Sequence, residues 1–242
     1  NSGILLVTGP TGSGKTTTVY SILQDLKNTS KNIMTIEDPI EYKMDGINQI
    51  QVNHKVGLTF EKGLKAILRQ DPDIIMVGEI RDIETAKIAV RAAITGHLVI
   101  STLHTNDAIS SIARLIDMEI APYLLNASLI GIISQRLVRK VCENCSNEVV
   151  IKQDENKSIT TTIPIGCEEC SYTGYSGRTV AYEILQVDDD IRNAIQQGKD
   201  AKDIKPIAIK NGMITFEDTY SMLIETNTTT IEECMMNKEI LI

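Results

Sequence analysis

The chain has 242 residues, of which 42% are hydrophobic and 23% are charged, so its composition excludes a disordered protein. Its formal net charge of −8 provides no overall attraction for nucleic acid or for an anionic membrane surface. No apolar run approaches the roughly 20 residues that a membrane-spanning helix needs. The first residues, Asn1-Ser2-Gly3, are neither a start methionine nor a signal peptide, and we expect a segment of chain before them.

Residues 1–137 alternate short apolar runs with amphipathic segments. The apolar runs predict strands at residues 4–8, 32–37, 73–77 and 98–102. Apolar residues spaced three or four apart predict helices at residues 16–26, 60–68, 83–94, 106–118 and 122–137. Residues 42–52 alternate weakly, which is typical of a hairpin or an edge strand. Strands that alternate with helices favour an α/β fold with a largely parallel sheet.

The pattern changes beyond residue 137. Residues 138–178 contain two CxxC pairs, and the polar, threonine-rich stretch 152–162 predicts an exposed excursion. From residue 188 onward, short amphipathic segments predict a small helical region. We therefore expect three parts, namely an α/β core at residues 1–137, a cysteine-bearing region at 138–180 and a helical region at 181–242.

A glycine-rich sequence lies between the first predicted strand and the first predicted helix. It fits the phosphate-binding pattern GxxxxGK[ST], in the strand–turn–helix context which that pattern requires. The glycines let backbone N–H groups face phosphates, and the helix N-terminus adds partial positive charge. Lys15 would reach the β- and γ-phosphates, and the Thr16 hydroxyl would ligate Mg²⁺. The alternative is a glycine-rich turn without a ligand. The expected nucleotide-binding residues are Gly9, Pro10, Thr11, Gly12, Ser13, Gly14, Lys15, Thr16 and Thr17.

A carboxylate follows the predicted strand at residues 73–77. This strand has the Walker B form, except that Gly78 stands where a metal-associated aspartate is usual and Glu79 comes next. Ligands of open α/β sheets bind at the carboxyl ends of strands, so Glu79 can hold a Mg²⁺-bound water or orient an attacking water. The alternative is a solvated loop carboxylate.

Two other predicted strands also end in polar residues. Glu37, Asp38 and Glu41 lie at or just after the end of the strand at 32–37. Water attack on a γ-phosphoryl group needs a group that positions the nucleophile, although acidic residues at strand ends are commonplace. His104 follows the strand at 98–102, where a γ-phosphate sensor would lie, although a single histidine is more often a capping or core group.

Arginines are candidates for neutralising phosphate charge, within the chain or from a neighbouring subunit. The candidates are Arg69, Arg81, Arg91, Arg114, Arg136 and Arg139. Because most arginines in proteins are solvated, each candidate taken singly is expected to be a solvated surface residue. Arg81 is the first choice because it follows Glu79 within one short segment.

Five cysteines lie in the second half of the chain. Cys142 and Cys145 form one CxxC pair, and Cys167 and Cys170 form another. Four thiolates in this arrangement suit a tetrahedral Zn²⁺ better than a disulfide framework in so long a chain, and they indicate a reducing cytoplasm. The alternative is a redox pair or unused thiols. Cys234 stands alone, and we expect it to be a small core residue.

Several of these segments together resemble a known family. The sequences GPTGSGKTTT, TIEDPIEY, LRQDPDIIMVGEIRD and TGHLVISTLHTND, followed by the paired CxxC, are similar to those of the type II secretion and type IV pilus assembly ATPases. The resemblance runs in order from Gly3 to Glu183. Members of this family form ring-shaped motors that drive pilin or pseudopilin polymerisation. The resemblance implies a RecA-like P-loop ATPase core with a small zinc subdomain and a helical C-terminal region.

The resemblance also implies roles for single residues. Glu41 falls on the catalytic glutamate of the acidic stretch that this family calls the Asp box. Glu79 falls on the Walker B glutamate and His104 on the histidine of the His box, and a glycine at Gly78 is itself a family feature. ATP, Mg²⁺ and Zn²⁺ are the implied cofactors. Retraction motors generally lack the four cysteines, so their presence favours an assembly or secretion motor.

The implied partners are identical subunits in a hexamer, an inner-membrane platform protein and a cytoplasmic recruiting protein. The motor would lie in the cytoplasm, peripheral to the inner face of the membrane, with no span of its own and no nucleic acid. In the family, a preceding domain packs on the ATP-binding face and supplies arginines. Residues 1–242 alone are therefore expected to bind ATP but to hydrolyse it slowly.

Two other classes of protein remain as alternatives. The first is a nucleotide phosphotransferase with a zinc lid, although the cysteines lie far downstream of the carboxylates and His104, which suits a lid poorly. The second is a nucleic-acid translocase. The net charge of −8 and a content of seven Tyr, two Phe and no Trp weigh against it.

Overall fold

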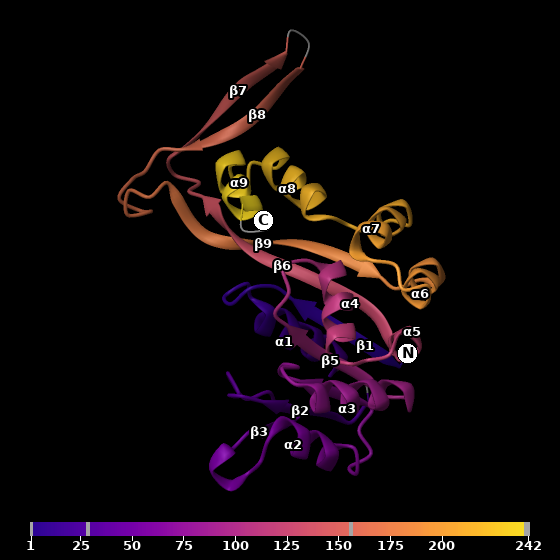
Figure 1. Cartoon of the computed structure of the whole chain (residues 1–242). Coiled ribbons are helices and arrows are strands. Elements are labelled where there is room, and N and C mark those ends of the chain that lie inside the picture. The colour runs from indigo at the N-terminus through magenta and orange to yellow at the C-terminus, as the bar shows by residue number, and fades with distance from the viewer. Residues whose placement is uncertain (1, 28–29, 155–156, 240–242) are drawn as a thin grey trace. The chain divides into compact units, whose positions relative to one another are not determined.

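The computed structural model describes residues 2–27, 30–154 and 157–239 (Figure 1). Contacts divide the chain into two compact units, and each unit joins two separate stretches of sequence. The first unit contains residues 1–134 and 184–213, and the second contains residues 135–183 and 214–242. The candidate phosphate loop therefore belongs to the first unit, and the four paired cysteines belong to the second.

The first unit is built on a parallel sheet. Its strands are β1 (Gly3–Thr8), β2 (Ile33–Glu37), β3 (Asn48–Gln51), β4 (Ile74–Val77) and β5 (Leu98–Leu103). The sheet order is β3-β2-β4-β5-β1-β6-β9, in which β6 (Leu129–Val141) and β9 (Tyr175–Gln186) each continue from one unit into the other. The four predicted strands and the predicted α/β class are confirmed, and the weak pattern at 42–52 contains the edge strand β3.

Helices alternate with these strands. They are α1 (Lys15–Leu26), α2 (Phe60–Ile67), α3 (Ile83–Ile94), α4 (Ala108–Asp117), α5 (Pro122–Ser128), α6 (Asp189–Gln196) and α7 (Ala201–Lys210), with a 3₁₀ turn η1 (His54–Val56). Most of these helices have an N-cap residue whose side-chain oxygen accepts a hydrogen bond from the first turn. Thr59 accepts from the Lys62 N–H at the start of α2, and Asp82 accepts from the Thr85 N–H at the start of α3. Such caps satisfy N–H groups that have no partner within the helix.

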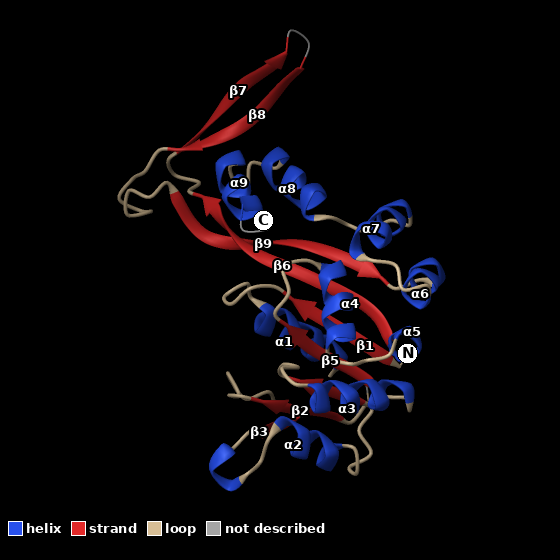
Figure 2. Cartoon of the chain, viewed as in Figure 1, coloured by secondary structure: helices blue, strands red, loops and turns tan. Residues whose placement is uncertain are grey.

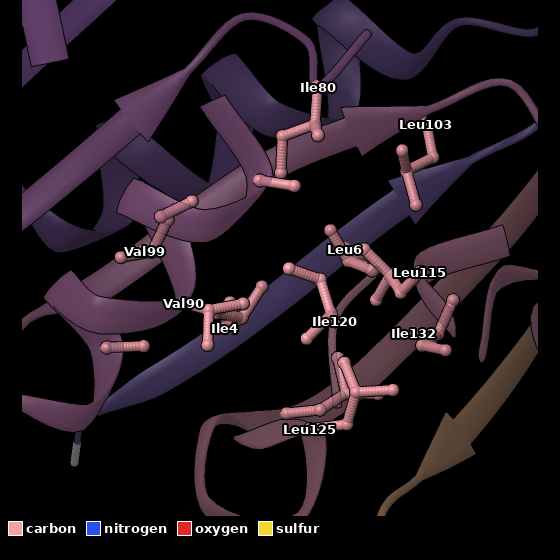
Figure 3. Packing of buried hydrophobic residues seen from close by; sticks show 14 of the residues in the cluster. Ile4, Leu6, Ile80, Val90, Val99, Leu103, Leu115, Ile120, Leu125 and Ile132 are labelled. Atoms are coloured by element: carbon pink, nitrogen blue, oxygen red, sulfur yellow. The ribbon is translucent and has the colours of Figure 1, made fainter. Parts of the chain in front are cut away.

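Strands β1, β2, β4 and β5 are buried on both faces, and alternate residues enter different cores. In β1, Ile4 and Leu6 belong to the larger core, whereas Val7 belongs to a second core. The larger core also contains α3 and α4, and Figure 3 shows Val90 and Leu115 of these helices beside Ile4 and Leu6. The second core contains the buried face of α1. The helix that follows the phosphate loop is thus fixed against the sheet.

The predicted helix at residues 122–137 is wrong beyond Ser128. Helix α5 ends there and strand β6 begins at Leu129, parallel to β1. Most β6 residues are buried on both faces, so the sequence shows a continuous apolar run instead of a strand alternation. Periodicity alone does not distinguish such a strand from a buried helix, and Pro122 at the first turn favoured the helix.

The polar stretch at 152–162, which was expected to form an exposed excursion, lies in a β-hairpin. Strands β7 (Ser146–Asp154) and β8 (Lys157–Pro164) pair antiparallel, as the red arrows in Figure 2 show. Residues 155 and 156 lie outside the described residues. Thr161 and Thr162 are buried. Threonine is β-branched and favours strands, so a threonine-rich stretch can form a strand although its side chains are polar.

The core of the second unit contains residues of β6, β9 and two helices, α8 (Phe216–Glu225) and α9 (Ile231–Glu239). Cys234 is 3% exposed in this core, as expected. The predicted helical segments after residue 188 are present, but α6 and α7 belong to the first unit and α8 and α9 to the second. The division into functional regions 1–137, 138–180 and 181–242 stays a prediction.

No helix formed by the described residues combines the length and the apolar character needed to cross a bilayer.

Gly63 provides a test of how closely α2 packs on the sheet. A Cβ added at this buried glycine would lie 1.8 Å from Cδ1 of Ile36, a residue of β2 with no exposed surface. We expect Gly63→Ala to lower the free energy of unfolding by about 1–3 kcal/mol, because overpacking outweighs the better helix propensity of alanine. Urea denaturation measures the change.

The matched control is Lys65→Ala on the exposed face of α2, where Lys65 pairs with Glu61 at 2.5 Å. Loss of such a surface pair should change the stability by less than about 0.5 kcal/mol. A Gly63→Ala variant as stable as the Lys65→Ala variant would contradict the packing described here.

Candidate functional site

The candidate site residues lie where neighbouring parallel strands end. Strand β1 pairs with β5, β5 with β4, and β4 with β2, all in parallel. The carboxyl ends of these strands therefore lie at one edge of the sheet, where open α/β folds bind ligands. The phosphate loop, the Glu37–Glu41 segment, Glu79 and His104 all follow these ends.

The phosphate loop turns through two glycines in the left-handed region. Gly12 has a φ of 78°, and Gly14, the N-cap residue of α1, has a φ of 85°. Other residues rarely adopt these angles, so Gly14, which belongs to the pattern, and Gly12, at one of its variable positions, bring the loop back to the helix. Thr16 and Thr17 are exposed at the start of α1. This geometry presents N–H groups and a hydroxyl at a helix N-terminus, as an anion site requires.

Lys15 is held within the same loop. Its Nζ donates hydrogen bonds to the carbonyl oxygens of Gly9 at 2.8 Å and Pro10 at 2.9 Å. Burial lowers the pKa of Lys15, and the negative charge of Glu79 acts in the opposite direction. Lys15 and Glu79 are therefore close enough to interact electrostatically, although they are far apart in sequence.

Glu79 lies at the centre of a cluster of ionisable groups. Its carboxylate is largely buried and forms an ion pair with Arg81. The Nε2 atom of His104 lies 3.6 Å from the second carboxylate oxygen. The structure thus brings Lys15, Glu79, Arg81 and His104 together at the ends of β1, β4 and β5.

Gly78 has a steric reason to be a glycine. A Cβ at this position would lie 3.3 Å from both the Cα of Glu37 and the carbonyl oxygen of Ile36. The Gly78 N–H donates to that same carbonyl at 2.8 Å, and the Gly78 carbonyl accepts from the Thr102 hydroxyl at 2.7 Å. The close approach of the ends of β2 and β4 therefore favours glycine at this position, where a Walker B strand usually carries an aspartate.

The acidic segment contains one buried and one exposed glutamate. Glu37 is 2% exposed, whereas Glu41 is exposed. The Glu41 N–H donates to the hydroxyl of Tyr20 at 3.3 Å, and Tyr20 donates to Glu37. Asp38 lies 3.6 Å from Nε2 of His54. These bonds place Glu41 with Glu37 at the end of β2, the strand beside β4.

Sequence reasoning missed Tyr20 and Gln49, which contact the acidic segment. Tyr20 lies on the buried face of α1, one helical turn after Thr16, and helical periodicity identifies it only as a core residue. Gln49 lies on the edge strand β3. In the sequence, Gln49 is marked only by its position in the weakly alternating stretch at 42–52, which follows the acidic segment.

The candidate arginines are in different surroundings. Arg81 is the one paired with Glu79, while Arg69, Arg91 and Arg114 are exposed. Arg136 is buried in the second unit, where it donates to the Asn237 carbonyl at 3.2 Å. Arg139 donates to Glu233 at 2.6 and 2.8 Å and lies 4.0 Å from the centre of the Tyr175 ring.

The four paired cysteines converge in the second unit. Their sulfur atoms all lie within 4.8 Å of one another, and three of the pairs are 3.8 to 3.9 Å apart. A tetrahedral zinc site with bonds of about 2.3 Å requires sulfur atoms about 3.8 Å apart. The cluster, which consists of Cys142, Cys145, Cys167 and Cys170, therefore has the donor atoms and the spacing that a zinc ion needs.

Backbone N–H groups also favour thiolates in this cluster. The N–H groups of Cys167 and Gly174 each donate to the sulfur of Cys170 at 3.2 Å. The first of these bonds is the main reason that the pKa of Cys170 is lowered to about 6. Gly166 donates to the sulfur of Cys145 at 3.3 Å, which opposes the effect of burial that raises the pKa of Cys145 to about 11. A metal bound by sulfur requires the thiolate form.

Comparison with known proteins identifies the family. Residues 1–236 match the family described as "Type II/IV secretion system protein". The chain belongs to this family. Type II secretion system protein HxcR of Pseudomonas aeruginosa is 49% identical over 233 residues, which cover 96% of this chain and 48% of that protein. The type IV pilus assembly ATPase PilB of Thermus thermophilus is 52% identical over 243 residues, and the match covers 96% of this chain and 27% of that protein.

Solved structures of secretion and pilus ATPases share the fold of this family member. The crystal structure of the pilus retraction motor PilT with bound ADP has a TM-score of 0.76 and 36% identity, and the match covers 98% of this chain and 61% of that one. The structure of the Legionella pneumophila ATPase DotB has a TM-score of 0.73 and 26% identity, and the match covers 99% of this chain and 60% of that one. The predicted family and fold class are confirmed, and neither a phosphotransferase nor a translocase is favoured. The chain spans about half the length of these curated relatives or less.

Proposed function

We propose that this family member binds and hydrolyses ATP as the motor part of a type IV pilus assembly or type II secretion machine. The observation that carries the proposal is the convergence of Lys15, Glu79, Arg81 and His104 beside the glycine-rich loop. Phosphoryl transfer depends on positioned charges more than on covalent chemistry by the protein. The names of the relatives, a pilus assembly ATPase and a type II secretion protein, support the same function.

Each group has a role in this proposal. Residues 9–17 bind the nucleotide, with Lys15 at the β- and γ-phosphates. Glu41 polarises the attacking water, and His104 senses the γ-phosphate through its contact with Glu79. Arg81 offsets negative charge once the phosphates approach Glu79. Positive charge near the phosphoryl group stabilises the transition state.

A hydroxyl and a carboxylate at this edge of the sheet are oxygen donors of the kind that Mg²⁺ prefers. Thr16 would ligate the ion and Glu79 would hold one of its water molecules. Bound Mg²⁺ neutralises phosphate charge.

We further propose that the cysteine cluster holds one zinc ion and that the ion fixes the turns between β6, the hairpin and β9. The sulfur spacing and the N–H bonds to sulfur support this assignment. The presence of the cluster favours an assembly or secretion motor over a retraction motor.

The proposed assembly is a hexamer of identical subunits that acts with an inner-membrane platform protein and a cytoplasmic recruiting protein. Its proposed location is the cytoplasm, peripheral to the inner face of the membrane. The relatives' places in secretion and pilus machines support these partners. The net charge of −8 is consistent with the proposal that nucleic acid is not a ligand.

Two substitutions separate binding from chemistry. Lys15→Ala should abolish nucleotide binding, because the loop loses its cation. Glu41→Gln preserves side-chain volume, so nucleotide affinity should persist while turnover falls roughly 100-fold or more. Titration with a fluorescent ATP analogue and release of inorganic phosphate measure the two effects.

The matched controls are Lys199→Ala and Glu84→Gln, which change exposed residues of the same types. Both should bind and hydrolyse ATP like the unmodified chain. Normal turnover in Lys15→Ala would exclude the loop as the nucleotide site, and normal turnover in Glu41→Gln would exclude Glu41 as the water-polarising group.

Zinc content tests the cysteine cluster. The purified protein should contain about one zinc ion per chain, and Cys142→Ser/Cys145→Ser should remove it. Nucleotide affinity should persist, because the phosphate loop lies in the other unit. Elemental analysis measures the metal, and Cys234→Ala is the control that should retain it. Wild-type protein without zinc, or a double variant that keeps it, would contradict the assignment.

A further inference from the structure

Glu37 is a buried carboxylate that the proposed mechanism does not use. It accepts hydrogen bonds from the hydroxyls of Tyr20 and Thr35, the latter at 2.5 Å, and from the Nε2 of Gln49 at 3.2 Å. A carboxylate with so little exposed surface is stable only when such donors surround it. Its partners come from α1, β2 and β3. Glu37 therefore joins three elements at the point where the acidic segment begins.

Tyr20 connects Glu37 to Glu41. Burial and the bond to Glu37 raise the pKa of Tyr20, so its hydroxyl keeps its proton and donates a hydrogen bond to the carboxylate. The lone pairs of the same oxygen remain as acceptors, and the Glu41 N–H donates to it at 3.3 Å. The Tyr20 ring also packs edge-on against Tyr42, with ring centres 4.7 Å apart. Tyr20 thus contacts two consecutive residues, since its hydroxyl bonds to Glu41 and its ring packs on Tyr42.

Gln49 holds the segment on the other side of Glu41. Besides the bond to Glu37, its Nε2 donates to the Tyr42 carbonyl at 3.2 Å. Its Oε1 accepts from the Met44 N–H at 2.7 Å. The nitrogen and the oxygen of this one amide therefore make three bonds, to residues 37, 42 and 44. Tyr20 and Gln49 thus hold the side chain of Glu37 and the main chain at residues 41, 42 and 44.

We propose that Tyr20 and Gln49, bonded through Glu37, are positioning residues that hold Glu41 over the nucleotide. Tyr20 lies on α1, the helix that begins at Lys15, so its bond to Glu41 fixes the acidic segment relative to the phosphate loop. The proposal rests on the proposed function, in which Glu41 polarises water. A displacement of about 1 Å in such a group can cost roughly 100-fold in rate.

The test uses Tyr20→Phe and Gln49→Met in the full chain. Tyr20→Phe removes one oxygen and keeps the ring that packs on Tyr42, and Gln49→Met keeps the length of the side chain. In each variant kcat should fall roughly 10-fold or more while KM for ATP stays within about twofold, because ground-state contacts to the nucleotide are unchanged. The matched controls, Tyr123→Phe and Gln197→Met, change exposed residues and should leave kcat unchanged.

A double-mutant cycle shows whether Tyr20 acts through Glu41. In a Glu41→Gln background, Tyr20→Phe should change the residual turnover by less than about twofold, since the carboxylate that it positions is already gone. Equal losses with and without Glu41, or a normal kcat in Tyr20→Phe, would overturn the proposal. If Tyr20→Phe does not fold, as judged by its thermal transition, the same cycle with Gln49→Met decides.

The outcomes also separate this proposal from the proposed function. If Glu41→Gln turns over ATP as fast as the unmodified chain, the role of Glu41 fails whatever Tyr20 does. If Glu41→Gln is slow and both positioning variants are normal, Glu41 keeps its role and the positioning network fails.

Discussion

Strands β2 and β4 end so close together that a Cβ at Gly78 would crowd the backbone of Glu37, and the site depends on this approach. The Gly78 N–H bonds to the Ile36 carbonyl at 2.8 Å, and an added Cβ would lie 3.3 Å from the backbone of Glu37. Two carboxylates, Glu37 and Glu79, are thereby placed at the ends of adjacent strands. The closeness of the strands also favours a glycine at Gly78, where other Walker B strands carry an aspartate, and Glu79 is then the carboxylate that follows β4.

The two carboxylates are used in different ways because their surroundings differ. Glu79 faces the Arg81 guanidinium and the His104 imidazole directly and Lys15 through its charge, so it can exchange partners when phosphates and a metal ion bind. Glu37 faces neutral donors that satisfy both of its oxygens. Such a group is suited to holding structure and not to chemistry, because breaking its bonds would leave a buried charge without partners. Catalytic work would then fall to the exposed Glu41.

How much the sequence predicts depends on whether a feature is local. The glycine-rich loop and Glu79 could be proposed as site residues because they belong to contiguous patterns, and the parallel strands could be predicted because they are short apolar runs between helices. Strand β6 was mistaken for a helix because burial on both faces removes the alternation that marks a strand. Tyr20 and Gln49 could not be found in this way. Their role arises from contacts between α1, β3 and the acidic segment, and those contacts exist only in the folded chain.

The most direct test of this account is a crystal structure of the full chain with a non-hydrolysable ATP analogue and Mg²⁺. The account predicts that the phosphates lie in the loop of residues 9–17 with Lys15 at the γ-phosphate. It also predicts that the Glu41 N–H keeps its bond to Tyr20 while the Glu41 carboxylate lies about 3 Å from a water that faces the γ-phosphate. A nucleotide bound elsewhere, or a Glu41 carboxylate directed away from the γ-phosphate, would contradict it.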